Sequence, residues 1–307
     1  EVSRQPLLPV AQDQRFICRL IDEAFDEFGL YMVHHNRWVT SASTNRMGEI
    51  TAGELHSLVP RPFRGRMALK LAKRQSGRCP YLFSVAPAGY RAQVEPERMP
   101  PSPEGFPPTH DLLEQSWHSY LAAMESLLAE QPYLLGERFT VADASAYGQL
   151  SMNLIDPTTA ADLQRRAPRT YCWLVDIRDG RHHGSSGKLL LSPALQPLLD
   201  IIMQTFAPLM SQNERAYRRC LEAGEVQFNE AAFDRGQALY DGELLGFAFR
   251  SVAKTFQVSV WQSLCAHWHQ LDEGTRAGLE RDSGRDLLTE LAVRDTHHGG
   301  RGHCRVL

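Results

Sequence analysis

The sequence predicts a mainly α-helical fold with one small β-hairpin. Apolar residues recur at helical spacing from Phe16 to Phe28 and again from Leu112 to Leu128. This spacing gathers each set on one face of a helix, which can then be buried in a core. A clear helix start at Thr140 adds a third element, whereas strand-like alternation is confined to residues 237–250. We therefore expect a helical bundle with a helical extension and a small hairpin.

The helix start at Thr140 is the most specific local signal. Thr140 is followed three residues later by Asp143, and Gly136 supplies a turn just before them. A threonine oxygen can accept the amide of the third helical residue while the carboxylate there accepts the amide of the cap, which satisfies two otherwise unpaired donors. The pattern predicts a capped helix from Thr140 through Ile155.

The first half of the chain is expected to begin with a helix near Asp13. A second capping pattern, Thr51 with Glu54, predicts a short helix that ends before Pro60, because the residue preceding a proline is pushed out of the helical region. Residues 61–78 are expected to form another helix. Prolines crowd residues 95–108 and predict an exposed loop without regular structure.

The second half is expected to form a helical extension over residues 193–294, after a flexible loop at 180–192. Ser192 and Pro193 provide an N-cap and a first-turn proline for its first helix, which Pro208 should kink. An Asp241-Gly242 turn should close the hairpin, because this pair tolerates the positive φ angles of a type I′ turn. A final helix should carry Val252, Phe256, Val260, Leu264 and Trp268 on one side. The tail, residues 295–307, has no apolar period and is expected to be disordered.

The order of these signals resembles the C-terminal helical domain of the glutathione S-transferases. That family carries a Leu-Leu-Gly turn, a Thr-x-Ala-Asp box and a proline-led helix with an inward tryptophan, which correspond here to 134–136, 140–143 and Pro168 with Trp173. Residues 6–9, the helix that follows them and Arg37-Trp38 resemble the linker and first helix of bacterial members. The resemblance covers about residues 6–40 and 109–179, within a predicted helical domain at 13–179.

The resemblance implies a partner domain that this sequence does not contain. Family members place a thioredoxin-like domain before the linker, and that domain binds glutathione and stabilises its thiolate. Only residues 1–12 precede the first helix here, and we interpret them as a linker remnant. Because the chain opens on Glu1 rather than methionine, we expect a processed or truncated product whose first domain lies outside the sequence. Glutathione is thus a cofactor by resemblance only, and the catalytic residue is unknown.

Composition limits the classes of partner. The net charge of −3 gives no bulk attraction to nucleic acid or to an anionic membrane, and no apolar run is long enough to span a bilayer. We therefore expect neither of these partners. The cysteines occur singly, without a C-x-x-C pair, which fits a reducing cytoplasm. The resemblance adds a possible homodimer and a small hydrophobic or anionic ligand.

Polar and aromatic residues gather just after the first predicted helix. They include Tyr31, His35, Arg37 and Trp38, and the resemblance places them near the cleft that holds the electrophilic substrate. Arginine beside tryptophan suits a flat, anionic ligand through a charge-assisted hydrogen bond and ring stacking. Two structural explanations stay open: Trp38 packs in the core, and Arg37 bridges to a neighbouring acid.

Three other features have a functional and a structural interpretation. Cys79-Pro80-Tyr81 resembles the start of a glutaredoxin-type site, or is an incidental surface cysteine. The acid-free segment between Glu54 and Glu95 carries eight basic residues and is either a nucleic-acid surface or, more in keeping with its lack of aromatic platforms, a solvated face or one that meets an acidic partner. His267 and His269, two positions apart, point to different sides of a helix, and the tail set of 297, 298, 303 and 304 lacks a catalytic motif, so no metal is expected.

The sequence therefore supports competing functions. The first is the hydrophobic-substrate and dimerisation half of a glutathione-conjugating enzyme, in which a thiolate held by the first domain attacks an electrophile. The second is a non-catalytic module that binds ligands or proteins and keeps only the fold. An enzyme of another type ranks last, because no nucleophile or acid–base arrangement stands out.

Overall fold

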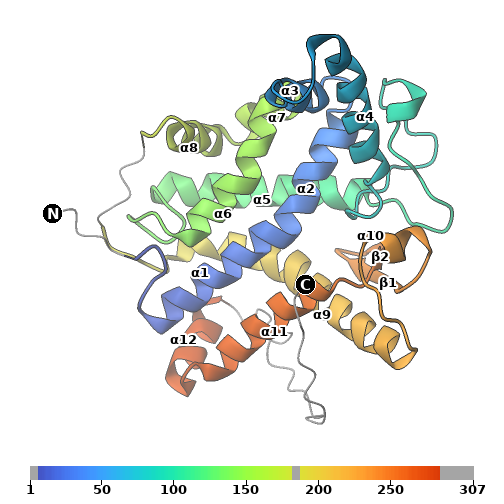
Figure 1. Cartoon of the computed structure of the whole chain (residues 1–307). Coiled ribbons are helices and arrows are strands. Elements are labelled where there is room, and N and C mark those ends of the chain that lie inside the picture. Colours follow the sequence, from blue (N-terminus) through green and yellow to red (C-terminus); the bar gives the residue numbers. More distant parts are fainter. Residues whose placement is uncertain (1–5, 182–186, 284–307) are drawn as a thin grey trace.

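The computed structural model describes residues 6–181 and 187–283. A continuous helix crosses the molecule and organises the bundle (Figure 1). It is formed by α1 (Gln12–Ala24) and α2 (Leu30–His35), with π-helical turns at Phe25–Gly29 and Asn36–Thr40. The predicted start near Asp13 is confirmed to within a residue. The predicted end is wrong: the polar cluster lies within the continued helix rather than after it.

The helices of the family-like domain pack around this first helix. They are α5 (His110–Glu130), α6 (Val141–Leu150), α7 (Pro157–Arg166) and α8 (Pro168–Arg178). The apolar stripes that predicted the first helix and α5 face inward: Phe25 of the first helix meets Tyr120 of α5 edge to face at 5.7 Å between ring centroids. Helix α7 was not predicted from the sequence. Trp173 points into the same core, as the resemblance implied. The mainly α-helical fold is confirmed.

The predicted capping box forms at the start of α6. Asp143 accepts the Thr140 amide and the Thr140 hydroxyl, each at 2.8 Å. Its second oxygen accepts the amide of Leu134 at 2.8 Å, so one buried carboxylate fixes both the helix start and the turn before it. The helix itself ends at Leu150, and a 3₁₀ turn, Ser151–Ile155, completes the predicted span.

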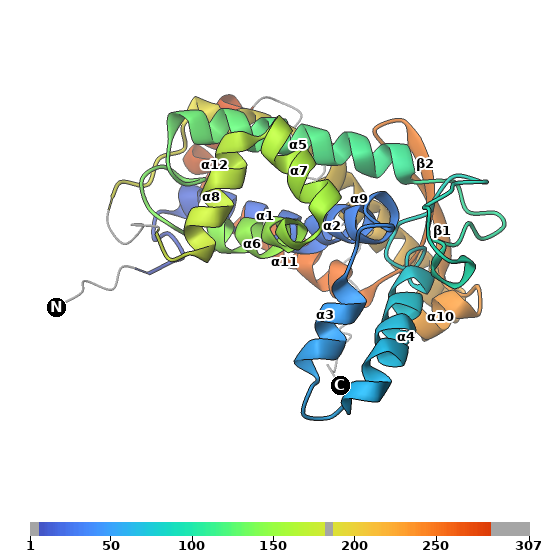
Figure 2. The same cartoon turned by 90° about the horizontal axis from the view of Figure 1, so that it is seen from above.

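A helical hairpin projects from the bundle (Figure 2). It consists of α3 (Met47–Glu54) and α4 (Arg64–Gly77). The predicted cap at Thr51 is wrong, because Thr51 lies inside α3. The side-chain Oδ1 of Asn45 instead accepts the Met47 amide at 2.7 Å. The hairpin is tight where Gly48 faces α4: a Cβ on Gly48 would lie 2.5 Å from the Ala68 carbonyl oxygen.

The proline-rich loop contains only one regular turn, a 3₁₀ turn at Pro96–Arg98. It is less exposed than predicted, since the ring of Phe106 packs edge to face on Phe233 at 5.5 Å. Ser102 also donates to the Ala86 carbonyl at 2.6 Å. The loop therefore lies against the body of the protein.

The extension shares the core of the bundle. After a 3₁₀ turn at Pro193–Leu195 it contains α9 (Gln196–Glu222), α10 (Glu230–Asp234), β1 (Leu239–Leu244), β2 (Phe247–Val252), α11 (Thr255–Gln270) and α12 (Glu273–Ser283). Helix α11 runs beside α1, and α9 packs on α5 (Figure 1). Pro208 lies inside α9, which continues to Glu222.

Details of the extension differ from the sequence-based expectation. The antiparallel pair β1–β2 turns at Leu245 and Gly246, both with positive φ, and Asp241-Gly242 lies within β1. Phe256 lies on α11, but its side chain is 69% exposed and does not share the buried side of the helix. The predicted final helix is followed by a further helix, α12. Tail residues 295–307 and most of the predicted flexible loop lie outside the described residues. No helix in the described ranges is long and apolar enough to cross a membrane.

Candidate ligand site

The predicted site residues lie on successive turns of α2 and its π-helical end, where they diverge into different environments. Tyr31 points toward the extension and His35 toward α5. The His35 Nδ1 atom is hydrogen-bonded to Ser84 Oγ at 2.7 Å, and its Nε2 to His110 Nδ1 at 2.9 Å. Burial lowers the pKa of His35 well below its usual value, so the ring is neutral and both nitrogens are engaged.

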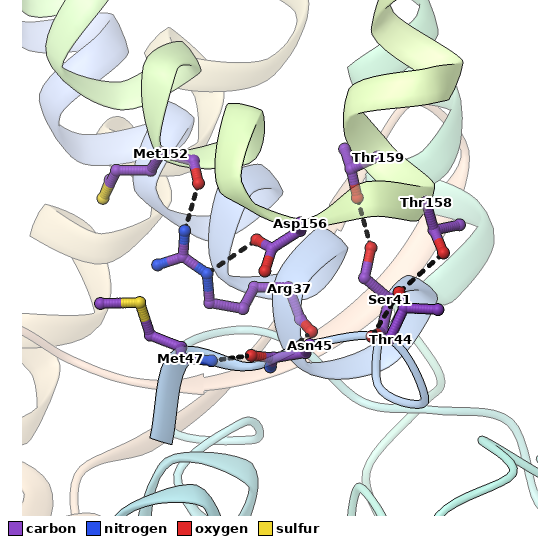
Figure 3. Close-up of polar contacts among 9 residues, drawn as sticks. All are labelled: Arg37, Ser41, Thr44, Asn45, Met47, Met152, Asp156, Thr158 and Thr159. Carbon is purple, nitrogen blue, oxygen red and sulfur yellow. Dashed lines mark hydrogen bonds and ion pairs between the residues drawn. The ribbon is translucent and has the colours of Figure 1, made fainter. Parts of the chain in front are cut away.

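Arg37 anchors the end of the long helix to the 3₁₀ turn after α6 (Figure 3). Its Nε donates to Asp156 Oδ2 at 2.8 Å in a largely buried ion pair, and a terminal nitrogen donates to the Met152 carbonyl. The backbone of Arg37 accepts from Asn45 Nδ2 at 3.0 Å. Bridging to an acid is therefore its structural role, although the acid is 119 positions away rather than a neighbour.

A cavity of about 270 Å³ opens between α2 and the α3–α4 hairpin. We call it the apolar cavity. Trp38 and Arg37 are part of its lining, so the structure brings these predicted residues together, whereas Tyr31 and His35 are absent from it. Leu30 and Val33 of α2 also line the cavity. The remaining walls could not be predicted from the sequence, because Met47, Leu71 and Met152 lie on other elements, separate from α2 along the chain.

His34 supplies the least satisfied polar group of the apolar cavity. Its side chain is buried, and neither ring nitrogen has a hydrogen-bond partner. Burial lowers the pKa of His34 to about 3, the nearby Arg78 and Arg37 charges add to this shift, and the side chain of Gln75 opposes it. The imidazole is therefore neutral, with one donor and one acceptor, and Gln75 is its polar neighbour in the same lining. Trp38 lies beside it, with 6.3 Å between ring centroids.

A polar cluster missed by the sequence joins α2 to the extension. Lys254 Nζ donates to Tyr31 Oη at 2.5 Å and to the Tyr81 carbonyl at 3.1 Å. Gln257 Nε2 donates to the same Tyr31 oxygen at 2.8 Å and to Glu27 at 3.0 Å. Burial lowers the pKa of Lys254 to about 7 and raises that of Glu27. The Tyr31 hydroxyl therefore accepts hydrogen bonds from two residues of the extension and links α2 to α11.

Cys79 is neither a surface cysteine nor a glutaredoxin-type thiol at a helix N-terminus, the two interpretations that the sequence left open. Its side chain is 0% exposed and follows the C-terminal end of α4, so it is not a surface cysteine and no helix N-terminus faces it. Burial raises the pKa of its thiol to about 12. A thiol in this state is a poor nucleophile, which argues against a glutaredoxin-like role.

The basic segment forms the outer side of α4. Arg66, Lys70, Lys73 and Arg74 are exposed there, while Arg78 at the base pairs with Glu230 of α10 at 2.8 Å. His269 is exposed and His267 is half-buried on α11. The histidines of the tail lie outside the described residues.

One described group brings potential metal ligands together. His110, Asp111 and Glu114 offer ligand atoms within 4.8 Å of one another. However, Nδ1 of His110 is hydrogen-bonded to His35, and both acids are exposed. This surface group gives no argument for a metal.

The arrangement defines a helical bundle of the kind that the sequence resemblance implied. Comparison with protein families agrees: residues 85–152 match the model for the glutathione S-transferase C-terminal domain. The match supports a glutathione S-transferase C-terminal domain in this part of the chain, from the segment before the proline-rich loop to Met152 in the cavity wall. No curated protein and no solved structure matched the chain.

Proposed function

We propose that this chain supplies the hydrophobic-ligand half of a glutathione S-transferase-like protein and that the apolar cavity holds the ligand. The observation that supports this most directly is the neutral, unpartnered His34 beside Trp38 in a mainly apolar lining. Pockets of this kind, with few polar groups that fix orientation, are typical of small-molecule sites.

The charge balance indicates a neutral rather than an anionic ligand for this cavity. Arg37 is the cation in the lining, and Asp156 already offsets its charge. A small aromatic molecule with one hydroxyl or carbonyl group would stack near Trp38 and hydrogen-bond to His34. The predicted anionic ligand would gain little from a guanidinium that is already paired.

The cavity does not fit glutathione itself. It offers no free cation for the carboxylates of the tripeptide, and no described cysteine, tyrosine or serine is in its lining to activate a thiol. Among the described residues the strands form one two-stranded antiparallel sheet, unlike the sheet of a thioredoxin-like domain. We therefore place glutathione binding and thiolate stabilisation, if the protein is an enzyme, on a separate thioredoxin-like domain.

A cavity-filling variant with a matched control tests ligand binding. Leu71→Trp fills the apolar cavity, whereas Leu69→Trp puts the same side chain on the same helix at a position that is 57% exposed. With 1-naphthol as the probe and tryptophan fluorescence as the readout, we expect Leu71→Trp to bind about tenfold more weakly or worse. Equal affinities in the two variants, with both folded by circular dichroism, would remove the cavity from the proposal.

The alternative is a non-catalytic ligand-binding or protein-interaction module. It is favoured by the absence of an activated thiol or hydroxyl from the described cavity lining. Both functions predict that the 307-residue chain alone will not conjugate glutathione to a generic aromatic halide. They differ once a thioredoxin-like domain from a bacterial relative is added: restored turnover supports the enzyme, and its absence with 1-naphthol binding intact supports the module.

Two further expectations belong to the same proposal. The family resemblance implies a homodimer, which light scattering of the purified chain would test. The described cysteines are all free thiols, which is consistent with a reducing cytoplasm as the place where the protein works.

A further inference from the structure

A second hollow lies at the opposite end of the long helix, between the first turns of α1 and the last turns of α11. Its volume is about 610 Å³. We call it the arginine groove, because Arg15 and Arg19 of α1 are its charged lining residues. None of its lining residues is an aspartate or a glutamate. It therefore differs from the apolar cavity, where the arginine is neutralised by an acid.

Arg15 and Arg19 form no ion pair in the described structure, although Asp22 and Glu23 lie near enough to Arg19 for their charges to interact with it. Neither arginine side chain has a hydrogen bond there, although the chain contains many arginines that are paired. Their i, i+4 spacing places both on one side of α1. Arg15 is exposed and Arg19 is half-buried, so their guanidinium groups can accept a ligand without giving up an existing contact.

His267 adds a potential donor on the α11 side of the arginine groove. Its ring packs edge to face against Phe16 at 5.5 Å between centroids, which restricts its orientation. Partial burial lowers the pKa of His267, and the charges of Arg15 and Arg19 lower it further. The two arginines and His267 therefore face one another across the same groove.

Other local charges modify the field of the two arginines without cancelling it. The start of α1 has no side-chain cap at Ala11, so unpaired amides add positive partial charge, whereas the carbonyl end of α11 adds negative partial charge. Glu23 lies one turn beyond Arg19, and burial raises its pKa to about 7, so its negative charge is only partly present near neutral pH. Asp22 also offsets part of the Arg19 charge. Neither acid is in the lining of the groove. The arginines thus remain the main charges of the groove.

Apolar side chains complete the lining. Leu8, Leu264 and Leu271 contribute, together with the exposed Val10. We propose that the arginine groove binds an organic anion that joins a carboxylate or sulfonate group to an aromatic or aliphatic body. The anionic group is held by Arg15 and Arg19 in charge-assisted hydrogen bonds, and its apolar body lies against the leucines. This inference is independent of the function proposed for the apolar cavity.

The test compares a groove variant with a control of equal charge change. The probe is an anilinonaphthalene sulfonate dye, followed by fluorescence titration. Arg15→Gln/Arg19→Gln removes the groove cations, and Arg66→Gln/Lys70→Gln removes an exposed i, i+4 pair from α4. We expect the groove variant to bind about tenfold more weakly or worse and the control to match the wild type. Arg15→Lys/Arg19→Lys should retain part of the affinity.

Two outcomes would overturn the proposal. One is unchanged dye affinity in the groove variant, and the other is an equal loss in both charge variants, which would show a response to net charge alone. Circular dichroism and the thermal midpoint confirm that each variant is folded. The Leu71→Trp variant tests whether the two sites are independent. Because Leu71 lines the apolar cavity and not the arginine groove, this variant should bind the dye in the groove as the wild type does, whether or not the apolar cavity binds 1-naphthol.

Discussion

Tyr31 and Lys254 are 223 positions apart, yet the lysine ammonium donates to the tyrosine hydroxyl at 2.5 Å and lies 4.6 Å from the centroid of its ring. The contact joins the long first helix to the connection between β2 and α11. It makes the extension part of the domain rather than an appendage, in agreement with the apolar core that both share.

The lowered pKa of Lys254 predicts a pH-dependent stability. The pKa falls from an ordinary value of 10.5 to about 7 on folding, so between these values the unfolded chain binds more protons. The free energy of unfolding should therefore gain a contribution that rises with pH across this window. Lys254→Met should lack that contribution. Urea titrations of both proteins from about pH 7 to 9.5 would show it, and parallel profiles would contradict it.

The capping box predicts a graded loss of stability. Thr140→Ala should reduce the free energy of unfolding by about 1 kcal/mol, the usual loss for an N-cap. Asp143→Ala should cost more, about 2–3 kcal/mol, because it leaves the amides of Leu134 and Thr140 buried without acceptors. The exposed Ser259→Ala on α11 serves as the control and should change little. An effect of Thr140→Ala no larger than that of the control would disprove the energetic role of the cap.

The capping box could be predicted because it depends on residues a few positions apart. The position of the turn between β1 and β2 could not be predicted from neighbouring residues in the same way. Gly242 lies opposite Phe249, and a Cβ on Gly242 would come within 2.3 Å of that ring. The glycine is needed for this close approach, and the positive φ angles fall instead on Leu245 and Gly246.

The candidate site was predictable only in part. The sequence singled out Arg37 and Trp38, which line the apolar cavity, because an arginine beside a tryptophan is a local pattern. It could not locate Asp156, which pairs with Arg37, or the hairpin residues that complete the apolar cavity. It also could not show that no acid lines the groove of Arg15 and Arg19, since this depends on what α11 places opposite them.

The tight contact between α3 and α4 predicts opposite effects for glycines of the same helix. Gly48→Ala should lower the free energy of unfolding by about 1–3 kcal/mol, because its new methyl group would meet the Ala68 carbonyl. Gly53→Ala faces open space and should stabilise α3 by up to about 1 kcal/mol through helix propensity. Chemical denaturation of both variants measures the difference, and destabilisation by both would point to a general intolerance of α3 instead.

Thiol labelling can test the burial of Cys79 directly. Cys79 has no exposed surface and a pKa raised to about 12, whereas Cys172 on α8 is exposed. Iodoacetamide near pH 8 should therefore modify Cys172 in the native protein while Cys79 stays protected, because the reagent requires an accessible thiolate. Peptide mapping by mass spectrometry identifies the labelled residue, and labelling in urea provides the fully accessible reference. Rapid native labelling of Cys79 at the rate seen for Cys172 would show that the loop after α4 opens readily and would restore the redox interpretation of this cysteine.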